Sequence, residues 1–573
     1  MEINQKNKWV LKPKADTTTV EQLASELSVG TKIAELLILK GIQTFDDAYH
    51  FFRPKLEKLH NPFLMKNMDT AVSRIIKAVN NGENMMIYGD YDVDGTTSVS
   101  MMYRFISSLS KNVMHYIPDR YLEGYGVSFQ GIQHAIDHNV SLIISLDCGI
   151  KAVDKVKKAK DSFIDFIICD HHLPGDVLPD AIAILDPKQK DCNYPYKELS
   201  GCGVGFKLIQ AICTKLQLPD DLYKQYLDLV TVSIAADIVS ITGENRILAY
   251  YGLKKLKEKP NLGLKALSTY CNKPDFTISD IVFKIAPKIN AAGRIDHADL
   301  AVDLLTSEDQ NHVEQTVKII GELNSERKTL DADVTQEALS QIIENQEEKN
   351  AASVVFGKNW HKGVLGIVAS RLTESYYRPT IVFTESNGKM VASARSVKGY
   401  NVHDALKHCS EFLEQFGGHK YAAGLTMNPK QYSLFKKTFE EHVKKTISKS
   451  SLIPQIEIDT ELALEDIHPK FNRILKQFAP FGPQNMRPVF LTRNVFDSGY
   501  AKEIGNDKKH LRMNVYQEGA RNIFKAVGFG LGNYLPYIKN KPFDIVYTIE
   551  ENYWQGKSYL QLSVKDIRVE KTS

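Results

Sequence analysis

Between residues 84 and 186 the chain repeats one pattern, a short apolar run that ends at an aspartate. The runs cover residues 85–88, 142–146, 166–169 and 181–185, and they lead into Asp90, Asp147, Asp170 and Asp186. Helix-length stretches separate them. Nearly continuous apolar runs that alternate with helices are typical of a parallel sheet buried on both faces. Ligands of such sheets bind beyond the carboxyl ends of the strands, so the pattern predicts an α/β fold with a polar site at one edge.

The rest of the chain predicts further folded parts, about three or four domains for 573 residues. Apolar residues at three- and four-residue steps predict one long helix over 308–349, with two shorter helices broken near Gly321 as the alternative. Residues 350–430 return to α/β patterning, with a helix expected over 402–416 before a glycine-rich stretch. Residues 455–573 alternate like the strands of a small barrel or sandwich.

The N-terminal residues 1–75 look helical and polar, and we expect them to cap the domain that follows. The predicted fold class is therefore α/β, with a parallel-sheet domain and a smaller α/β domain joined by a long helix, and a C-terminal all-β module. The predicted boundaries are 1–75, 76–306, 307–349, 350–450 and 451–573.

Composition excludes several classes of protein. No run of about 18 apolar residues occurs, which argues against a transmembrane helix, and the polar N-terminus argues against a signal peptide. The seven cysteines form no CxxC pair, so we expect reduced thiols, a cytoplasmic location and no structural zinc site.

Charge is distributed unevenly along the chain, although the formal net charge is only +3. Residues 471–573 carry 16 lysines and arginines against 9 acidic residues, whereas residues 307–350 carry 4 against 11. The chain therefore has a basic C-terminal module and an acidic spacer before it, so its charges are segregated along the sequence. The aromatic residues of the basic module, Tyr516, Phe524, Phe529 and Trp554, suit base stacking, although most such residues belong to a core.

The strongest chemical signal is the sequence Asp90-Tyr-Asp92-Val-Asp94-Gly, which follows a predicted strand and precedes a predicted helix. Carboxylates gathered in a small volume raise one another's pKa unless positive charge compensates, and a divalent cation supplies that charge. A calcium-binding EF-hand loop also begins D-x-D-x-D-G, but it needs a glutamate at position 12. That position is Met101 here, so the EF-hand interpretation fails.

Three further signals follow: Asp147 and the run Asp170-His171-His172, each at another predicted strand end, and Asp237, in a segment otherwise too apolar to hold an unpaired charge cheaply. Aspartate and histidine together suit Mn²⁺ or Mg²⁺. Taken singly, a strand-end aspartate is more often a helix N-cap, and a histidine pair is more often surface or core packing. Four such signals at one sheet edge favour a metal site.

Two glycine-rich stretches were weighed as phosphate-binding loops. Residues 201–205 lack the spacing and context of a dinucleotide site, and no Walker-type motif occurs. Residues 417–424 suit a close backbone approach to phosphate, which alone is a weak signal.

In order, Asp90-x-Asp92-x-Asp94-Gly, Asp147, Asp170-His-His and Asp237 resemble the four motifs of the DHH phosphoesterase superfamily. Residues 417–424 resemble its DHH-associated substrate domain. Four further stretches resemble the exonuclease branch of the superfamily: Arg120 to Gly126, Asn290 to Arg294, Trp360 to Arg371, and Ser393 to Ser396. The resemblance covers the chain from about residue 45 to its end.

The resemblance implies a two-metal phosphodiesterase that degrades single-stranded DNA from the 5′ end in recombination and repair. Asp92, Asp147, His171 and Asp237 would hold one Mn²⁺ or Mg²⁺, while Asp90 and Asp147 would share a second. Asp94 and Asp170 would complete the catalytic set, and His172 would face the scissile phosphate. The residues expected to bind DNA are Arg120, Tyr125, Arg294, His361, Ser393, Arg395, Ser396 and His419.

The C-terminal module would be an OB-fold that guides the strand. The resemblance also implies a single-strand binding protein and a RecQ-type helicase as partners. The chain departs from the superfamily in two places: Met86 stands where phosphatase-like members carry a histidine, and Gln484-Asn485-Met486 replaces the usual glycine and Asn-Pro after Pro480-Phe-Gly.

Two alternatives remain open. The first is a DHH enzyme that acts on pyrophosphate or very short oligonucleotides, which needs no basic β module. The second is a non-catalytic DNA-binding relative, in which motif carboxylates would be missing, whereas none is missing here.

Overall fold

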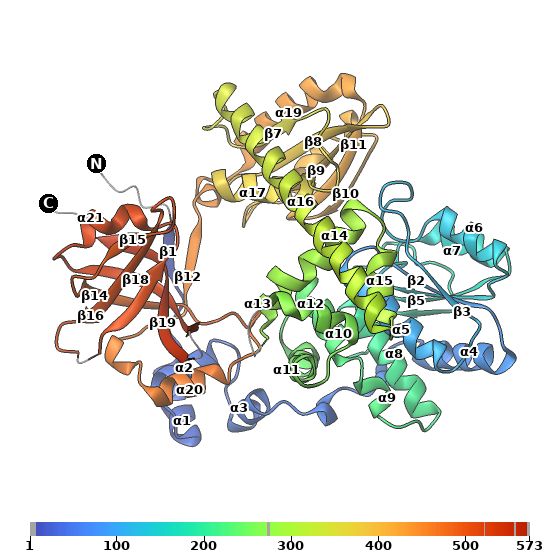
Figure 1. Ribbon diagram of the computed structural model, residues 1–573, viewed down its shortest axis with the longest axis horizontal. Coiled ribbons are helices and arrows are strands. Elements are labelled where there is room, and N and C mark those ends of the chain that lie inside the picture. Colours follow the sequence, from blue (N-terminus) through green and yellow to red (C-terminus); the bar gives the residue numbers. More distant parts are fainter. Residues whose placement is uncertain (1–6, 272–275, 521, 555–556, 570–573) are drawn as a thin grey trace. The chain divides into compact units, whose positions relative to one another are not determined.

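The computed structural model describes residues 7–271, 276–520, 522–554 and 557–569 (Figure 1). Within these ranges the chain forms two compact units. Unit 1 takes in residues up to 52, 331–479 and 487 onward, and unit 2 takes in 53–330 and 480–486. No described helix is both long enough and apolar enough to cross a membrane.

Unit 2 is built on a five-stranded sheet in the order β3-β2-β4-β5-β6, with every neighbouring pair parallel. Its strands are β2 (Met85–Gly89), β3 (Val113–Tyr116), β4 (Leu142–Leu146), β5 (Asp165–Cys169) and β6 (Ala183–Leu185). The predicted parallel sheet is confirmed. Strand β3 was not predicted, because it lies at a sheet edge and is only half-buried along its length, so its sequence lacks a continuous apolar run.

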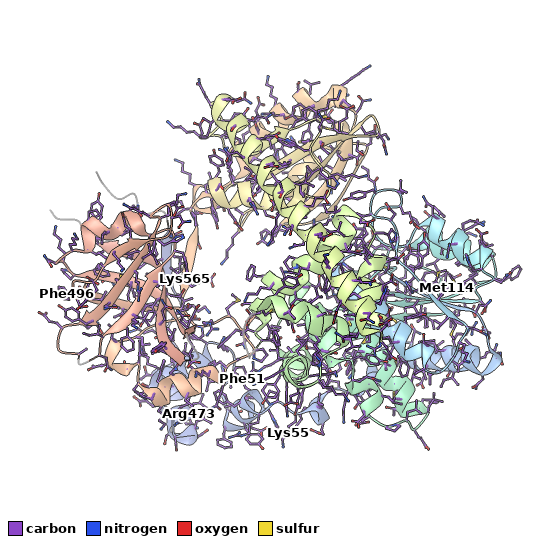
Figure 2. All side chains as sticks on the ribbon, viewed as in Figure 1. Phe51, Lys55, Met114, Arg473, Phe496 and Lys565 are labelled. Atoms are coloured by element: carbon purple, nitrogen blue, oxygen red, sulfur yellow. The ribbon has the colours of Figure 1, made fainter. Side chains whose placement is uncertain are left out.

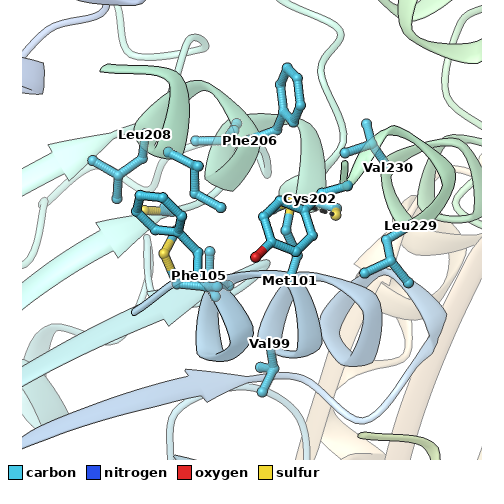
Figure 3. Close-up of a cluster of buried hydrophobic side chains, with 14 of the residues drawn as sticks. Val99, Met101, Phe105, Cys202, Phe206, Leu208, Leu229 and Val230 are labelled. Carbon is cyan, nitrogen blue, oxygen red and sulfur yellow. Dashed lines mark hydrogen bonds between the residues drawn. The ribbon is translucent and has the colours of Figure 1, made fainter. Parts of the chain in front are cut away.

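Helices cover both faces of this sheet, as the largely apolar, buried strands β2, β4, β5 and β6 require. Met85 and Ile87 of β2 face the larger core, whereas Met86 and Tyr88 face the other. The larger core is packed by α4 (Met68–Asn81), α5 (Val93–Ser107), α8 (Gly201–Lys215) and α10 (Leu227–Ala236). Figure 3 shows Met101 and Phe105 of α5 beside Phe206 of α8 and Val230 of α10. The opposite face is covered by α6 (Phe129–Asp137) and α7 (Val153–Asp161).

The remaining elements of unit 2 are short or lie outside the sheet. They are η1 (Leu56–Lys58), η2 (Pro62–Leu64), α9 (Asp221–Lys224), α11 (Gly243–Glu258), α12 (Leu262–Ser268), η3 (Thr269–Cys271), α13 (Ile278–Asp280), the π-helix η4 (Ile281–Ile285), α14 (Ala286–Ile295) and α15 (Asp299–Thr306).

The predicted long helix is confirmed as α16 (Gln310–Glu344), a single element of 35 residues. The alternative of two helices broken near Gly321 is wrong. A Cβ at Gly321 would lie 2.8 Å from the hydroxyl of Tyr270, so the glycine serves close packing rather than a helix break.

Residues 353–446 of unit 1 form a five-stranded sheet in the order β10-β11-β9-β8-β7, flanked by helices. The strands are β7 (Ser353–Phe356), β8 (Thr380–Ser386), β9 (Lys389–Arg395), β10 (Gln415–His419) and β11 (Ala422–Met427). The helices are α17 (Leu365–Tyr376), α18 (Val402–His408), η5 (Ser410–Phe412), η6 (Pro429–Gln431) and α19 (Tyr432–Thr446).

One expectation for this region is wrong in part, because the helix predicted over 402–416 ends at His408. The glycine-rich stretch that follows is a β-hairpin in which Gly417 pairs with Gly424. Apolar residues at 412, 413 and 416 continue the helical spacing, yet they pack on the core from a short 3₁₀ turn and a strand instead.

The C-terminal module is a closed barrel, in agreement with the predicted all-β fold. Strand β14 (Phe490–Asp497) pairs with both β18 (Phe543–Trp554) and β16 (His510–Gln517), which closes the sheet through β19 (Lys557–Val569) and β17 (Phe524–Gly528). The smaller elements are η7 (Lys449–Leu452), β12 (Gln455–Ile458), β13 (Thr460–Glu461), η8 (Leu464–Asp466), α20 (Pro469–Lys476), β15 (Lys502–Ile504), η9 (Gly532–Tyr534) and α21 (Leu535–Ile538).

The predicted stacking aromatics of the barrel differ in their surroundings. Phe524 is buried in the core, whereas Phe529 is 69% exposed. Tyr516 stacks on Phe496, with ring centroids 5.8 Å apart (Phe496 is labelled in Figure 2). The side chain of Trp554 lies outside the described part of the chain.

The segment 1–75, expected to cap the next domain, is divided between the two units. Met65 and Met68 pack on the core of unit 2, whereas the described residues up to 52 belong to unit 1 with the C-terminal module. Strand β1 (Lys8–Leu11) pairs in parallel with β12, and the Trp9 indole donates to Asp566 at 2.8 Å. The helices α1 (Thr17–Leu27), α2 (Thr31–Ile38) and α3 (Phe45–Phe52) follow. The Phe51 ring meets Phe478 edge-on, with ring centroids 5.4 Å apart (Phe51 is labelled in Figure 2). Sequence separation hid this pairing, because nothing local to residues 8–52 identifies a partner more than 400 residues away.

Residues 480–486, which join α20 to the barrel, form a tight turn within unit 2. The Asn485 N–H donates to the carbonyl of Gly482 at 2.9 Å, with Pro483 and Gln484 between them. Gln484 has φ of +58°. A type II turn needs positive φ at this position and favours glycine there, which explains the glycine that the superfamily usually carries.

We expect Gln484→Gly to raise the free energy of unfolding by about 1 kcal/mol, because an L-residue is disfavoured in the left-handed region and glycine is not. Thermal unfolding of the full chain measures the effect. Gln477→Gly is the matched control, because Gln477 has φ of −72° and glycine there should lower stability. A loss of stability in both variants would contradict the strain at Gln484.

Candidate metal centre

The predicted site residues of the first four motifs meet at the carboxyl ends of the strands of unit 2. Asp90 and Asp92 follow β2, Asp147 follows β4, and Asp170-His171-His172 follows β5. Asp237 is the C-cap of α10, whose body is buried. Ligand atoms lie within 4.8 Å of one another in three overlapping groups of described residues: Asp90, Asp92 and Asp147; Asp94, His171 and Asp237; and Asp147, His171 and His172.

His171 lies at the centre of this cluster. Its Nε2 is 3.1 Å from Asp147 Oδ1, 3.6 Å from Asp237 Oδ2 and 3.7 Å from Asp94 Oδ2. Because Asp147 belongs to two of the three groups, its carboxylate is the one placed to be shared between two positions.

Several buried polar atoms of the cluster have no hydrogen-bond partner: Asp90 Oδ2, Asp147 Oδ1, and both ring nitrogens of His171. Buried polar groups are nearly always satisfied, so these atoms call for a ligand. Oxygen ligands with one imidazole fit Mn²⁺ or Mg²⁺. The residues present therefore fit a divalent metal centre.

Burial and mutual repulsion disturb the titration of these groups. Burial, and then the neighbouring Asp92, raise the pKa of Asp90 to about 8, while burial followed by Asp94 raises that of Asp237 to about 8. Burial also raises the pKa of Asp147 well above its ordinary value. Burial lowers the pKa of His171 to about 4, so its imidazole is neutral at pH 7 and keeps a lone pair for a metal.

The Asp94 carboxylate accepts more hydrogen bonds than its neighbours, since Asp90 accepts from the Gly126 N–H at 3.3 Å and Asp92 from the Gly95 N–H at 3.0 Å. The backbone N–H groups of Gly201 and Cys202 donate to the two Asp94 oxygens at 2.7 and 2.8 Å, and the Ser233 hydroxyl donates at 2.7 Å. Gly201 and Cys202 are the first residues of α8, where N–H groups and the helix dipole favour an anion. Asp94 thus anchors α5 to α8 and α10 beneath the cluster.

Gly201 also lies directly against the shared ligand. A Cβ at Gly201 would be 2.6 Å from the Cβ of Asp147, a distance too short for any side chain to be accommodated at residue 201. In the sequence, residues 201–205 are glycine-rich but lack the spacing of a dinucleotide-binding motif. Their role is instead to bring the start of α8 close to two aspartates.

The second histidine of the motif belongs to a separate hydrogen-bonded chain. His172 Nδ1 lies 2.8 Å from Asp170 Oδ1, and its Nε2 lies 3.0 Å from the Tyr125 hydroxyl. Burial opposes the charged form of His172, but the bond with Asp170 outweighs it and raises the pKa of His172 to about 9. The imidazolium is therefore the form expected at pH 7.

A left-handed backbone occurs at one metal-ligand candidate and directly after another. Asp147 has φ of +60°, and Ile238, which follows Asp237, has φ of +58°. A β-branched residue in the left-handed region is a rare outlier, and such strain persists only where the surrounding structure fixes it.

The residues predicted to bind DNA fall into two sets, one in each unit. In unit 2 the Arg120 guanidinium stacks over the Tyr91 ring at 4.6 Å, and the Tyr121 hydroxyl donates to the carbonyl of Arg294. In unit 1 Arg395 donates to the Ser393 hydroxyl at 3.0 Å. The other predicted residues of unit 1 are His361 before α17, Ser396 after β9, and His419 at the exposed end of β10.

One buried carboxyl near the cluster was not predicted as a site residue. Asp186 follows β6, is fully buried, and leaves its Oδ2 without a hydrogen-bond partner. Burial raises its pKa to about 7. It ends the fourth apolar run of the repeating pattern, so the same signal that found Asp147 and Asp170 marks it too.

Comparison with known proteins agrees with this geometry. The profile of the DHH family, N-terminal domain, matches residues 84–234, and the DHHA1 domain matches residues 347–445. The fold and the site therefore define a phosphoesterase of the DHH class. The RecJ OB domain matches residues 458–566.

A single-stranded-DNA-specific exonuclease RecJ of Bacillus subtilis is 37% identical over 569 residues, which cover 98% of this chain and 71% of that protein. The chain belongs to the RecJ family. The crystal structure of RecJ from Thermus thermophilus in complex with Mn²⁺ has 25% identity and a TM-score of 0.85, covering 100% of this chain and 81% of its own. The structure of that protein in complex with Mg²⁺ has 23% identity and a TM-score of 0.78, covering 99% and 79%.

We expect Mn²⁺ binding to release protons and to strengthen as the pH rises from 6 to 8. With pKa values of about 8 for Asp90 and Asp237, both carboxyls are mostly protonated at pH 7, and a metal displaces those protons. Each released proton should change the affinity about tenfold per pH unit below its pKa. Calorimetry in two buffers of different ionisation enthalpy counts the protons.

The matched variant is Asp237→Asn, which keeps the shape of the side chain but has no proton to release. Its pH slope should be smaller than that of the wild type, at weaker affinity. Affinity that does not change with pH, without proton release, would contradict protonated carboxyls at this site.

Proposed function

We propose that this chain is a metal-dependent exonuclease that hydrolyses the phosphodiester bonds of single-stranded DNA from the 5′ end, in recombination and repair. Single-stranded-DNA exonuclease activity is what defines the family to which it belongs. The observation that carries the assignment to particular residues is the carboxylate cluster around Asp147, with unsatisfied buried oxygens on two aspartates.

Two divalent metals, Mn²⁺ or Mg²⁺, would supply charge that activates a water and stabilises the leaving oxygen. Asp92, Asp147, His171 and Asp237 are the proposed ligands of one, and Asp90 shares Asp147 for the other. Asp94 holds the helices beneath these ligands through its bonds to α8. His172, protonated and oriented by Asp170, faces the substrate phosphate as a proton donor.

Arginines are the first proposed phosphate contacts, Arg120 and Arg294 in unit 2 and, separately, Arg395 in unit 1. A guanidinium suits bidentate phosphate binding better than an ammonium, which supports this role for Arg120, Arg294 and Arg395. The remaining proposed contacts are Tyr125, His361, Ser393, Ser396 and His419. The barrel, with its excess of basic residues and the exposed ring of Phe529, suits tracking of a single strand.

We further propose a cytoplasmic location, with a single-strand binding protein and a RecQ-type helicase as partners. The proposed domain assignment is an N-terminal segment (1–75), a DHH catalytic domain (76–306), a connecting helix (307–349), a DHH-associated substrate domain (350–450) and an OB-fold (451–573).

One assay separates this function from the two alternatives. Purified protein is given long single-stranded DNA, a dinucleotide or pyrophosphate, each with Mn²⁺ or with EDTA. Metal-dependent release of mononucleotides from the long strand supports the exonuclease. Turnover of only the small substrates would indicate the other DHH class, and binding without turnover would indicate a non-catalytic factor.

We expect Asp92→Ala to abolish hydrolysis while the chain stays folded. Removing one of several mutually repelling carboxyls should not unfold the domain, but metal activation contributes several kcal/mol, or orders of magnitude in rate. Steady-state kinetics and a thermal melt measure both effects. A folded variant that keeps more than about a tenth of the wild-type rate would exclude Asp92 as a ligand, since one decade corresponds to only about 1.4 kcal/mol.

We expect Arg395→Ala to raise KM for 5′-phosphorylated DNA and to narrow the gap between 5′-phosphate and 5′-hydroxyl substrates. Losing one charge-assisted contact should cost about 1.5–3 kcal/mol. The measurement is kcat/KM for both substrates. Lys389→Ala is the control, because Lys389 is exposed on the same strand and paired with Glu414. An equal loss on both substrates would show that Arg395 does not read the terminal phosphate.

A further inference from the structure

Residues 480–486, here called the clip, belong to unit 2, although the chain immediately before and after them belongs to unit 1. The path of the chain therefore passes into the catalytic unit and back within a few residues. The contacts of the clip explain why these residues pack within unit 2.

The clip is fixed to the segment that follows the last motif aspartate. The backbone N–H of Ile241 donates to the carbonyl of Pro483 at 2.8 Å. Arg246, itself nearly buried, donates to the carbonyl of Pro480 at 3.4 Å. The Asn485 side-chain amide donates to the same carbonyl at 2.8 Å, which closes the clip on itself.

Close packing adds to these bonds. A Cβ at Gly482 would lie 2.5 Å from Cγ1 of Ile241, whose side chain is fully buried. The backbone of the clip thus rests directly on Ile241, and any side chain at residue 482 would push the two apart.

Ile241 is only four residues from Asp237, a chain length of at most about 14 Å. Between them lies Ile238, at φ of +58° with 64% of its surface exposed, so burial of its side chain does not offset the strain. The turn is also held by Asn245, whose side-chain amide donates to the carbonyl of Ser240 at 3.0 Å. A strained backbone conformation persists at a functional site only where several surrounding contacts fix it, as they do here.

We propose that the clip is a positioning element of the metal centre. By fixing Ile241, residues 480–486 keep the turn after α10 in the strained conformation that directs the Asp237 carboxylate toward His171, and so set the affinity of the site for metal. This inference rests on the proposed role of Asp237 as a metal ligand. It gives the clip, which lies between α20 and the barrel in the sequence, a role in the chemistry of unit 2, to which it belongs.

The test is a Mn²⁺ titration of the full chain, followed by the paramagnetic resonance signal of free Mn²⁺, together with a thermal melt in EDTA. The variants are Gly482→Ala, whose added Cβ would displace the clip from Ile241, and Asn485→Ala, which removes the bond from the Asn485 amide to the carbonyl of Pro480. Gly263→Ala is the matched control: its Cβ would lie 2.3 Å from the carbonyl of Leu304, elsewhere in unit 2. All titrations are run at a temperature where every variant is folded.

We expect Gly482→Ala to weaken Mn²⁺ binding at least tenfold and Asn485→Ala to weaken it by a smaller factor. Gly263→Ala should lower the melting temperature without changing Mn²⁺ affinity. Adding Ile241→Ala to Gly482→Ala removes the clashing Cγ1 and should recover part of the lost affinity.

Wild-type Mn²⁺ affinity in both clip variants, whatever their melting temperature, would overturn the proposal and leave the clip a purely structural element. Asp237→Asn separates this outcome from failure of the proposed function. If Asp237→Asn weakens Mn²⁺ binding and the clip variants do not, only the clip inference falls. If Asp237→Asn leaves binding unchanged, the ligand assignment itself falls.

Discussion

The repulsion among buried carboxylates is the constraint on which the rest of the catalytic unit depends. Asp90, Asp92 and Asp147 place oxygens within 4.8 Å of one another at the end of a buried sheet. In water such charges would separate, and in a protein interior they protonate or bind a cation. The fold keeps them together because each follows a different buried strand or begins a helix packed against that sheet. A cation is therefore needed for Asp90, Asp147 and Asp237 to be ionised together at neutral pH.

The parts of this arrangement that could be predicted from the sequence are those encoded locally. Parallel strands buried on both faces must be continuously apolar, so β2, β4, β5 and β6 were visible, and the aspartates at their ends fell on one edge by topology alone. The spacing of apolar residues over 310–344 likewise required a helix. Each of these predictions needed only neighbouring residues.

The features that could not be predicted depend on contacts between distant residues. Strand β3 is recognisable only from its place beside β2, and β1 only from its pairing with β12. The hairpin at 415–427 was hidden because its apolar residues also fit a helical period. The role of Asp94 is of the same kind: within D-x-D-x-D-G it looks like its neighbours, and only the start of α8 reveals that its oxygens are already bonded.

Strain and close approach show how the site is kept in place. Asp147 adopts a left-handed backbone at the point where Gly201 lets α8 come within van der Waals reach of its Cβ. Ile238 adopts the same conformation where Asn245 and the clip fix the following residues. Asp147 is itself a ligand candidate, and Ile238 directly follows one, Asp237. In both places a glycine that has no room for a Cβ packs against the same segment. The two glycines, Gly201 and Gly482, belong to different parts of the chain, yet each removes the freedom by which a strained ligand would relax. A metal site made of repelling groups needs this rigidity, because without it the carboxylates would move apart before a cation could bind.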